Sequence, residues 1–250
     1  MCGRFVAAST PDEIATYFSA EAAPELAIEP HWNVAPTTDV FVVLADGQAR
    51  RVAAHHWGLV PFWAKDVKVG NRMINARAET LATNGAFKHA FAKRRCIVPA
   101  DGFYEWHKVP GQKVKQPYFI HRPDDEPFAF AGLWEEWKGP RPAADAPPTD
   151  PPAERLRSTT IITTTANEAM AAIHDRMPVI LPASAWAAWL DPEDDDIATL
   201  GRLLVPAPAS LTVLRPVSTE VNSVRNDGPQ LTIEAPPTPP AEPFLFAEQP

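Results

Sequence analysis

The second residue of the chain carries the most distinctive chemistry in the sequence. Removal of Met1 would leave Cys2 with a free α-amine and a thiol on adjacent carbons. Such groups have ordinary pKa values of about 8 and about 8.5, so both are partly available as nucleophiles near neutral pH. An aldehyde can form a Schiff base with the amine, and the thiol can then close a five-membered thiazolidine ring. The alternative is a cysteine in a frayed terminus, without any chemistry.

Asn75 and Glu105 are polar residues in apolar surroundings. Asn75 lies between Ile74 and Ala76, where an apolar side chain would pack, and is either a site residue or a turn cap. Glu105 is enclosed by aromatic residues. Desolvation favours the protonated form of a carboxyl and suits it to general acid–base catalysis. The alternative for Glu105 is an exposed strand residue in a salt bridge.

His174 is the histidine whose position best fits proton transfer near neutral pH. It follows an apolar helical face expected over Asn167 to Ile173 and precedes Arg176 and the Met177-Pro178 pair. The alternative is a histidine that caps the end of this helix.

The sequence predicts no metal site and no cofactor. Its two cysteines, Cys2 and Cys96, exclude a disulfide framework and a multi-cysteine zinc site. Cys96 is expected to be a buried small hydrophobe beside Ile97. The consecutive His55 and His56 lie in an expected strand, where they would face opposite sides of the sheet. Glycine-rich phosphate-binding and dinucleotide-binding motifs are absent.

The composition is that of a soluble globular protein of 250 residues, with 45% hydrophobic and 22% charged residues. No apolar run is long enough to span a membrane, and a cytoplasmic location is expected. A net charge of −8, from 31 acidic and 23 basic residues, argues against a nucleic-acid partner. The Lys and Arg residues are concentrated in a few segments, however, so a local basic face remains possible. They include Arg72, Arg77, Lys88, Lys93, Arg94 and Arg95.

The expected elements indicate an α+β fold. Strands outnumber helices without βαβ alternation, which favours a mainly antiparallel, barrel-like sheet core with flanking helices. Thr10-Pro11-Asp12-Glu13 predicts a helix that begins with a capping box. Asp46-Gly47 predicts a hairpin between strands at 40–44 and 48–57. A helix is expected over 84–95, with Phe87 and Phe91 facing inward, followed by a strand at 95–100.

One domain is expected over residues 1–233. The segment 138–152 is rich in Pro, Ala and Asp and reads as a loop inserted between strands. The Pro-rich segment 234–250 reads as a disordered tail.

A series of motifs, in order along the chain, resembles the SRAP (SOS response-associated peptidase) family. The resemblance runs from Met1 to about Gln230 and excludes the inserted loop and the tail. The motifs are Met1-Cys2-Gly3-Arg4-Phe5, Asn33-Val34-Ala35-Pro36, Trp57-Gly58-Leu59-Val60-Pro61, Asn75-Ala76-Arg77-Ala78-Glu79, Arg95-Cys96-Ile97-Val98-Pro99-Ala100-Asp101-Gly102-Phe103-Tyr104-Glu105-Trp106, His174-Asp175-Arg176-Met177-Pro178 and Val221-Asn222-Ser223-Val224-Arg225-Asn226.

The resemblance implies a sensor of abasic sites in single-stranded DNA that acts in the DNA damage response. Cys2 would form a thiazolidine crosslink with the ring-opened sugar, and AP lyase activity would accompany it. Asn75 would orient the N-terminal amine or the sugar, and Glu105 would assist Schiff-base formation. His174 would protonate the sugar hydroxyl side and help to reverse the link.

The resemblance also implies a DNA-binding groove. Arg4, Arg77 and Arg176 match positions that hold phosphates, and Trp63 and Trp106 would supply surfaces against bases. Asn33 and Pro36 are expected in the same groove. The protein would associate with the nucleoid when bound to DNA. Replication proteins are left open as partners, and a monomer is the default.

Two other functions remain open. The first is a thiol peptidase with Cys2 as nucleophile, whose minimal reaction would be autoproteolytic removal of Met1. The second is a module that binds single-stranded DNA without a covalent step. Only the crosslinking function predicts a denaturant-stable DNA adduct that requires Cys2. This adduct distinguishes it from the peptidase and from the non-covalent binding module.

Overall fold

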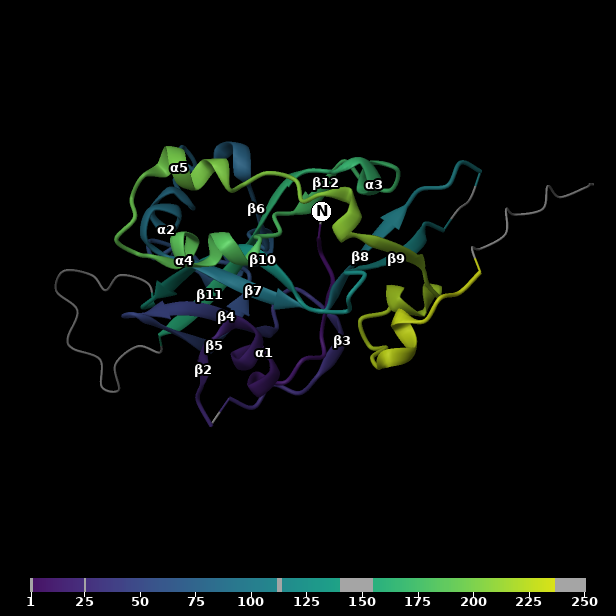
Figure 1. Ribbon diagram of the computed structural model, residues 1–250, viewed down its shortest axis with the longest axis horizontal. Coiled ribbons are helices and arrows are strands. Elements are labelled where there is room, and N and C mark those ends of the chain that lie inside the picture. The colour runs from purple at the N-terminus through teal and green to yellow at the C-terminus, as the bar shows by residue number, and fades with distance from the viewer. Residues whose placement is uncertain (1, 25, 112–113, 140–154, 237–250) are drawn as a thin grey trace, which may run out of the picture.

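A computed structural model describes residues 2–24, 26–111, 114–139 and 155–236 (Figure 1). Most of the predicted inserted loop and nearly all of the predicted tail lie outside these residues. Their assignment, and that of a single domain over residues 1–233, stays a prediction. No helix in the described ranges is both long and apolar enough to cross a membrane.

Helix α1 (Pro11–Phe18) begins with the predicted capping box. The Glu13 backbone N–H donates to the Thr10 hydroxyl at 3.3 Å, and the Thr10 backbone N–H donates to the Glu13 carboxylate at 2.8 Å. These bonds satisfy two donors that the first helical turn would leave unpaired. Ile14 and Phe18 are buried on the inner face of the helix.

Five strands close into a barrel at the centre of the molecule. The order is β5, β4, β7, β10 and β11, and β11 then pairs with β5 in parallel to complete the ring. The strands are β4 (Asp39–Asp46), β5 (Ala49–Trp57), β7 (Arg95–Ala100), β10 (Phe128–Trp137) and β11 (Leu156–Thr165). Gly47 has φ of +60° in the turn between β4 and β5, which confirms the predicted hairpin.

A second sheet of five antiparallel strands lies beside the barrel, on the right in Figure 1. Its order is β13, β9, β8, β1 and β3. The strands are β1 (Phe5–Ala7), β3 (His31–Val34), β8 (Gly102–His107), β9 (Gln116–His121) and β13 (Val213–Pro216). The predicted α+β fold with a mainly antiparallel, barrel-like core is confirmed.

Three short strands pair with the barrel. β2 (Glu21–Ala22) pairs in parallel with β5. β6 (Asn75–Arg77) pairs in parallel with β11, and β12 (Arg176–Pro178) pairs antiparallel with it. β11 therefore brings together two segments that are about a hundred residues apart in sequence.

The remaining helices of the described residues are short and either pack against the barrel or the second sheet or connect strands. They are α2 (Lys88–Lys93), α3 (Glu168–Ala171), α4 (Trp186–Leu190), α5 (Ile197–Arg202) and the 3-10 turns η1 (Val67–Arg72), η2 (Ala78–Thr80), η3 (Ala183–Ala185), η4 (Ala209–Leu211), η5 (Thr219–Asn222) and η6 (Pro229–Thr232).

The helix predicted over 84–95 is shorter than expected. Phe87 and Phe91 are buried, as predicted, but α2 ends at Lys93 and Arg95 belongs to β7. The Arg95 guanidinium is buried and donates to the carbonyls of Phe91 and Ala92 at 2.8 and 2.6 Å. These bonds satisfy carbonyls at the end of α2, so a strand residue closes the helix that precedes it.

Alternation along each strand divides the barrel side chains into two apolar clusters. In β4, Phe41 and Val43 pack in the cluster that contains the buried faces of α1, α2, α4 and α5, whereas Val40 and Val42 pack in the other. Helices lie outside a closed barrel, so the second set points inward.

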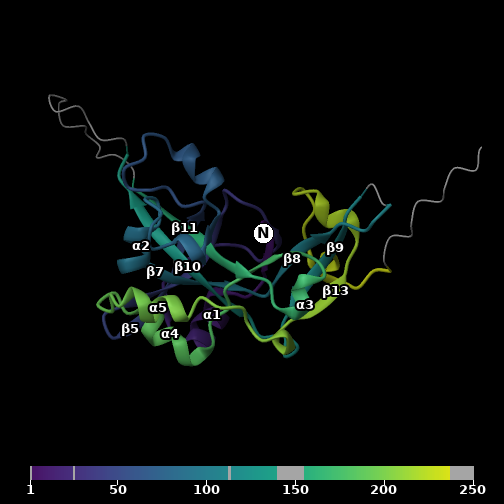
Figure 2. The same cartoon turned by 90° about the horizontal axis from the view of Figure 1, so that it is seen from above.

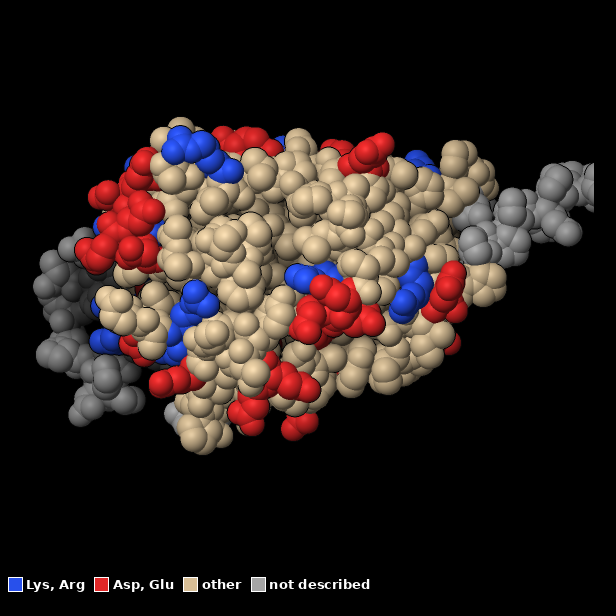
Figure 3. Space-filling view, viewed as in Figure 1, with Lys and Arg blue, Asp and Glu red and all other residues tan. Residues whose placement is uncertain are grey.

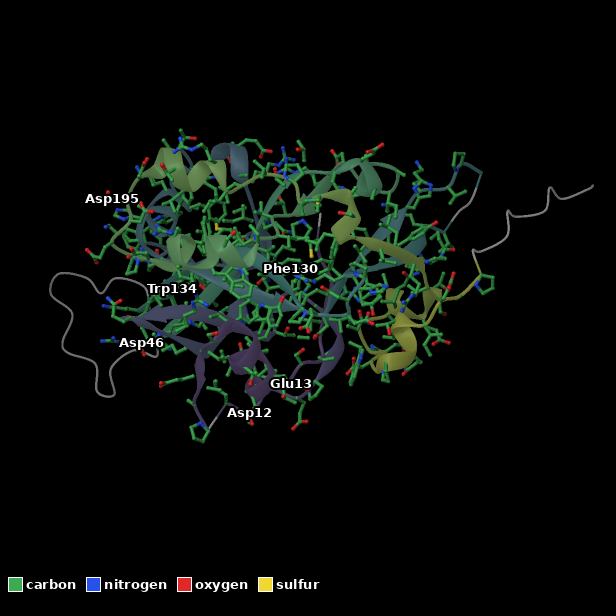
Figure 4. All side chains as sticks on the ribbon, in the orientation of Figure 1. Asp12, Glu13, Asp46, Phe130, Trp134 and Asp195 are labelled. Atoms are coloured by element: carbon green, nitrogen blue, oxygen red, sulfur yellow. The ribbon has the colours of Figure 1, made fainter. Side chains whose placement is uncertain are left out.

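The inner cluster continues from the barrel into the space between the two sheets. It joins Phe130 of β10, which Figure 4 labels near the middle of the molecule, to Phe5 and Phe103 of the second sheet. The Phe103 and Phe130 ring centroids are 5.8 Å apart with edge-to-face geometry. Cys2 belongs to this cluster, so the shared core of the barrel and the sheet contains the candidate nucleophile.

Candidate active site

Cys2 lies directly before β1, and the chain enters the molecule between the barrel and the second sheet (Figures 1 and 2). Its side chain is completely buried, so the alternative of a frayed terminus is wrong. Burial raises the pKa of the Cys2 thiol far above its ordinary value, and the negative charge of Glu105 raises it further. The resting thiol is therefore protonated at neutral pH.

Asn75 is held against the start of the chain by strand pairing. β6 lies along β11 with Asn75 opposite Ile161. From there the Asn75 Nδ2 donates a hydrogen bond of 2.8 Å to the backbone carbonyl of Cys2. The Asn75 Oδ1 is buried and has no partner among the described residues. Since a buried acceptor without a donor is costly, this oxygen is suited to a donor that the resting structure lacks.

Glu105 lies in β8, between β1 and β9. β8 runs antiparallel to β1 with Phe103 opposite Phe5, and this register carries Glu105 toward the residues that precede β1. The Glu105 residue is 3% exposed, so the alternative of an exposed strand carboxylate is wrong. Its electrostatic effect on Cys2 places the two groups in one site.

His174 lies between α3 and β12, two residues before β12 begins. The Arg176 backbone N–H donates to the His174 Nδ1 at 3.0 Å, and the same nitrogen lies 2.9 Å from the Asp175 carboxylate. A neutral imidazole can accept the first contact, whereas a protonated one can donate to the second. The imidazole therefore has partners in both protonation states, and its side chain is 29% exposed.

β11 relates the His174 segment to the Asn75 segment. Thr163 of β11 lies opposite Arg77 of β6 on one edge and opposite Pro178 of β12 on the other. Both candidate segments therefore lie one strand away from the same residue. This arrangement results from tertiary pairing and has no counterpart in the local sequence.

Arg77 and Arg176 are in different environments. Arg77 is exposed. Arg176 is buried, and its guanidinium contacts both carboxylate oxygens of Glu79 at 2.6 and 3.0 Å and the Thr163 carbonyl at 2.6 Å. The Arg176 bonds hold the pKa of the Glu79 carboxyl below its usual range. A phosphate that binds Arg176 would have to displace Glu79.

Arg4 and Asn33 form a buried polar contact with the C-terminal part of the chain. The Arg4 Nη1 donates to the Asn33 Oδ1 at 2.7 Å and to the Val221 carbonyl at 3.0 Å. The Arg4 guanidinium also lies 5.8 Å from the centre of the Trp106 ring. Partial burial lowers the pKa of Arg4, although an arginine stays charged at neutral pH.

Asn33 itself is completely buried. Asn33 therefore offers no surface to a nucleic acid in this structure. It can contribute to binding only indirectly, by holding Arg4 and the segment that follows Val221 in position. Pro36 follows the same strand, is half-buried, and precedes Thr37, whose φ is +70°. A positive φ at a β-branched residue marks a tightly constrained turn.

Trp63 is 54% exposed and Phe62 is 51% exposed, so two aromatic side chains project from one loop. Gly58 and Gly70 approach each other at the base of this loop. A Cβ added to Gly58 would lie 2.8 Å from the Gly70 carbonyl oxygen, and its φ is +137°. The aromatic pair therefore extends from a closely packed base that only glycine permits.

Among the predicted site residues, the structure brings Cys2, Asn75 and Glu105 together directly. Arg77 lies in β6, which pairs with one edge of β11, and His174 lies two residues before β12, which pairs with the other edge. Arg4, Asn33 and Trp106 form a separate cluster around the 221–226 segment. In the described part of the chain, no group of three or more His, Cys, Asp or Glu side chains is arranged to hold a metal ion.

Comparison with known proteins identifies the family. The profile described as SOS response associated peptidase (SRAP) matches residues 1–224. The chain belongs to the SRAP family. The abasic site processing protein YoqW of Bacillus subtilis is 42% identical over 232 residues, which are 92% of this chain and 98% of YoqW. The abasic site processing protein HMCES of Gallus gallus is 36% identical over 225 residues, with 82% of this chain and 66% of HMCES covered.

Solved structures share the SRAP fold of this chain. A crystal structure of a Bacteroides thetaiotaomicron protein superposes with a TM-score of 0.80 over 94% of this chain and 100% of that one, at 23% identity. A Bordetella bronchiseptica protein superposes with a TM-score of 0.69 over 87% of this chain and 100% of that one, at 26% identity. At these identities the first of them supports the fold alone.

Sequence reasoning missed three residues that shape this SRAP site. Glu79 engages Arg176, Asp175 contacts His174, and Asn222 accepts a hydrogen bond of 2.6 Å from the Trp106 indole. Each of them lies inside one of the motifs that carried the family resemblance. The motifs themselves were therefore the available signal. The partners in the Glu79–Arg176 and Trp106–Asn222 contacts are too far apart in sequence for spacing to reveal them, whereas Asp175 is the sequence neighbour of His174.

Proposed function

We propose that this protein captures abasic sites in single-stranded DNA through a covalent thiazolidine at Cys2, after removal of Met1. The observation that carries the proposal is the geometry at Cys2. The Cys2 thiol is buried in one site with the buried carboxyl of Glu105, and the Asn75 amide donates to the Cys2 carbonyl at 2.8 Å. Removal of Met1 would turn this buried cysteine into an aminothiol. Family membership and relatives named as abasic site processing proteins support the same reaction.

The reaction balances without an added cofactor. The Cys2 amine attacks the aldehyde of the ring-opened sugar, and loss of one water gives an imine. The thiol sulfur then bonds to the imine carbon, the thiol proton leaves, and the imine nitrogen gains a proton. The product is a thiazolidine whose mass is that of protein plus DNA minus one water.

Glu105, Asn75 and His174 divide the proton transfers and the positioning. The Glu105 carboxylate accepts the thiol proton, because a thiol whose pKa is raised needs a nearby base when it attacks. The unpaired Asn75 Oδ1 accepts a hydrogen bond from the α-amine or from a sugar hydroxyl. His174 protonates the sugar hydroxyl side, and Asp175 lies 2.9 Å from its Nδ1.

DNA is held by arginines and aromatic side chains around this site. Arg77 and Trp63 are exposed and available to a phosphate and to a base, respectively. Three further residues already have partners within the protein: Arg4, Arg176 and Trp106. They would contact DNA either through the part of the side chain that is exposed or after they release these partners. Stacking on aromatic side chains tolerates any base, which fits a lesion without sequence context.

A thiol peptidase is the weaker alternative. Such an enzyme needs a thiolate, and thiolates form where neighbouring positive charge lowers the pKa of the cysteine. Here burial and Glu105 raise the pKa of Cys2. AP lyase chemistry is a side path of the proposed reaction, because the Schiff base permits β-elimination until the thiol closes the ring.

The test is incubation of the protein lacking Met1 with a single-stranded oligonucleotide that carries one abasic site. We expect an adduct that survives denaturing electrophoresis, with the mass given above. Cys2→Ala should abolish it, and so should retention of Met1, whereas the matched Cys96→Ala variant should retain it. A stable adduct from Cys2→Ala at the wild-type yield would refute the proposal. Binding that is equal for intact and abasic strands, without an adduct, would favour a passive binding module.

A further inference from the structure

We infer that the turn Ser223–Asn226 is a DNA-binding element and that Arg225 contacts a phosphate of the strand that carries the abasic site. The inference rests on the proposed function and extends it to a residue outside the predicted groove. The segment 221–226 is the last motif of the chain. In Figures 1 and 2 this part of the chain lies beside the second sheet.

The buried amide of Asn33 anchors this turn. Its Nδ2 lies within hydrogen-bonding distance of three backbone carbonyls: Val221 at 3.4 Å, Ser223 at 3.0 Å and Asn226 at 2.8 Å. Its Oδ1 accepts from Arg4. One side chain from β3 thus fixes both ends of a turn almost two hundred residues away and ties it to Arg4.

Further contacts hold the flanks of the turn. The Trp106 indole donates to the Asn222 side chain at 2.6 Å. The Trp32 backbone N–H donates to the Asp227 carboxylate at 2.7 Å, and His31 lies 3.2 Å from the same carboxylate. The anchors come from β3 and β8, on either side of β1 in the second sheet.

The tip of the turn is exposed although its base is fixed. The Asn226 backbone N–H donates to the Ser223 carbonyl at 3.1 Å, which closes a turn with Val224 and Arg225 at its centre. Val224 is 57% exposed, and Arg225 is exposed and forms no ion pair with any described residue. An exposed cation on an anchored turn presents the feature that binds a phosphate of single-stranded DNA.

The position of the turn connects it to the proposed groove. Its anchors include Asn33, three residues before Pro36, and Trp106, which also contacts Arg4. The base of the turn is already ordered, so binding costs little additional conformational entropy. Two charges oppose the inference: Glu220 and Asp227 flank the turn, and both are exposed and repel a phosphate.

The test measures non-covalent binding in the Cys2→Ala background, with a fluorescent single-stranded oligonucleotide that contains a tetrahydrofuran abasic analogue. Because this analogue has no aldehyde, the measurement is independent of crosslinking. We expect Arg225→Gln to weaken binding roughly three- to tenfold at low salt and to reduce the slope of log K against log salt by about 0.7, as for loss of one phosphate contact. Glu220→Gln should have the opposite effect on affinity.

Arg202→Gln is the matched control, since Arg202 is also exposed but lies on α5, at the opposite end of the molecule from the turn (Figure 1). It should leave the salt slope unchanged. Equal slopes for Arg225→Gln and its parent, with DNA still bound, would overturn the inference and leave the proposed function intact. Absence of both DNA binding and the wild-type adduct would overturn the proposed function as well.

Discussion

At the scale of single residues, Glu105 has two opposite effects on the Cys2 thiol. The Glu105 charge opposes ionisation of the buried thiol, yet in the proposed reaction the same carboxylate is the base that accepts the thiol proton when an imine is present. Under the proposed function, the thiol is protonated at rest and is activated only when substrate is in place. We expect this arrangement to protect Cys2 from general electrophiles.

The substitution Glu105→Gln separates these two effects. Without the negative charge, the Cys2 thiol should ionise at lower pH and react faster with iodoacetamide. Without the base, the abasic-site adduct should form more slowly, by roughly 10²-fold. Alkylation is followed by mass spectrometry of the N-terminal peptide and adduct formation by denaturing electrophoresis. The exposed Glu126→Gln is the control; a change of both rates in the same direction would contradict the account.

At the scale of elements, β11 organises the site. It closes the barrel against β5 and receives β6 and β12, so its pairings place the Asn75 and His174 segments. A site built on paired strands holds its side chains more rigidly than one built on loops. The barrel therefore acts as the support of the chemistry as well as the core of the fold.

His55 inside the barrel makes the stability of this support depend on pH. The residue is 1% exposed, its ring lies 5.5 Å from the Trp134 ring, and neither ring nitrogen has a partner among the described residues. Burial lowers the pKa of His55 to about 3, and the charges of Arg157 and Arg51 contribute.

Because an unfolded histidine has a pKa of about 6.5, the unfolded chain binds one more proton than the folded chain between about pH 6.5 and pH 3. Folding stability should therefore fall as the pH falls through this window, with roughly 2–3 kcal/mol lost from this residue by pH 4.5. Denaturant unfolding at several pH values should show a smaller loss for His55→Gln than for the wild type. The exposed His89→Gln should follow the wild type; a parallel decline in all three would exclude His55 as the cause.

At the scale of the whole molecule, the charge of −8 does not by itself exclude DNA binding, because binding depends on the charges that line the contact surface. Figure 3 shows acidic side chains on the left of that face, where Figure 4 labels Asp195 of the acidic run between α4 and α5, and further acidic patches near its centre and along its margins. Basic side chains adjoin several of these acidic patches. A groove lined by few arginines can therefore bind phosphates without a basic surface overall.

Arg77 provides a test of this account. It is exposed at the end of β6, so Arg77→Gln should weaken binding of single-stranded DNA and reduce the salt slope by about 0.7. Filter binding or fluorescence anisotropy at a series of salt concentrations measures the slope. Arg155→Gln, at an exposed arginine that lies near Glu136, is the control. An unchanged slope for Arg77→Gln would remove Arg77 from the groove.

Local sequence was sufficient for features that depend on neighbouring residues. The capping box at Thr10, the hairpin at Asp46-Gly47 and the inward faces of Phe87 and Phe91 were all predicted, because each depends on residues within one or two turns. The end of α2 was misplaced because Arg95 is held by carbonyls of α2 and of the distant 189–194 segment. No local pattern encodes that contact.

The sequence by itself determined the family and the candidate site residues, because Cys2, Asn75, Glu105 and His174 stand in motifs that resemble the SRAP family. Only the tertiary structure decided the surroundings of these candidate residues. Burial and a neighbouring charge set the protonation of Cys2, and pairing on β11 sets the positions of Asn75 and His174. Desolvation and long-range strand pairing depend on the whole fold. The protonation and position of these side chains therefore could not be deduced from the residues next to them in sequence.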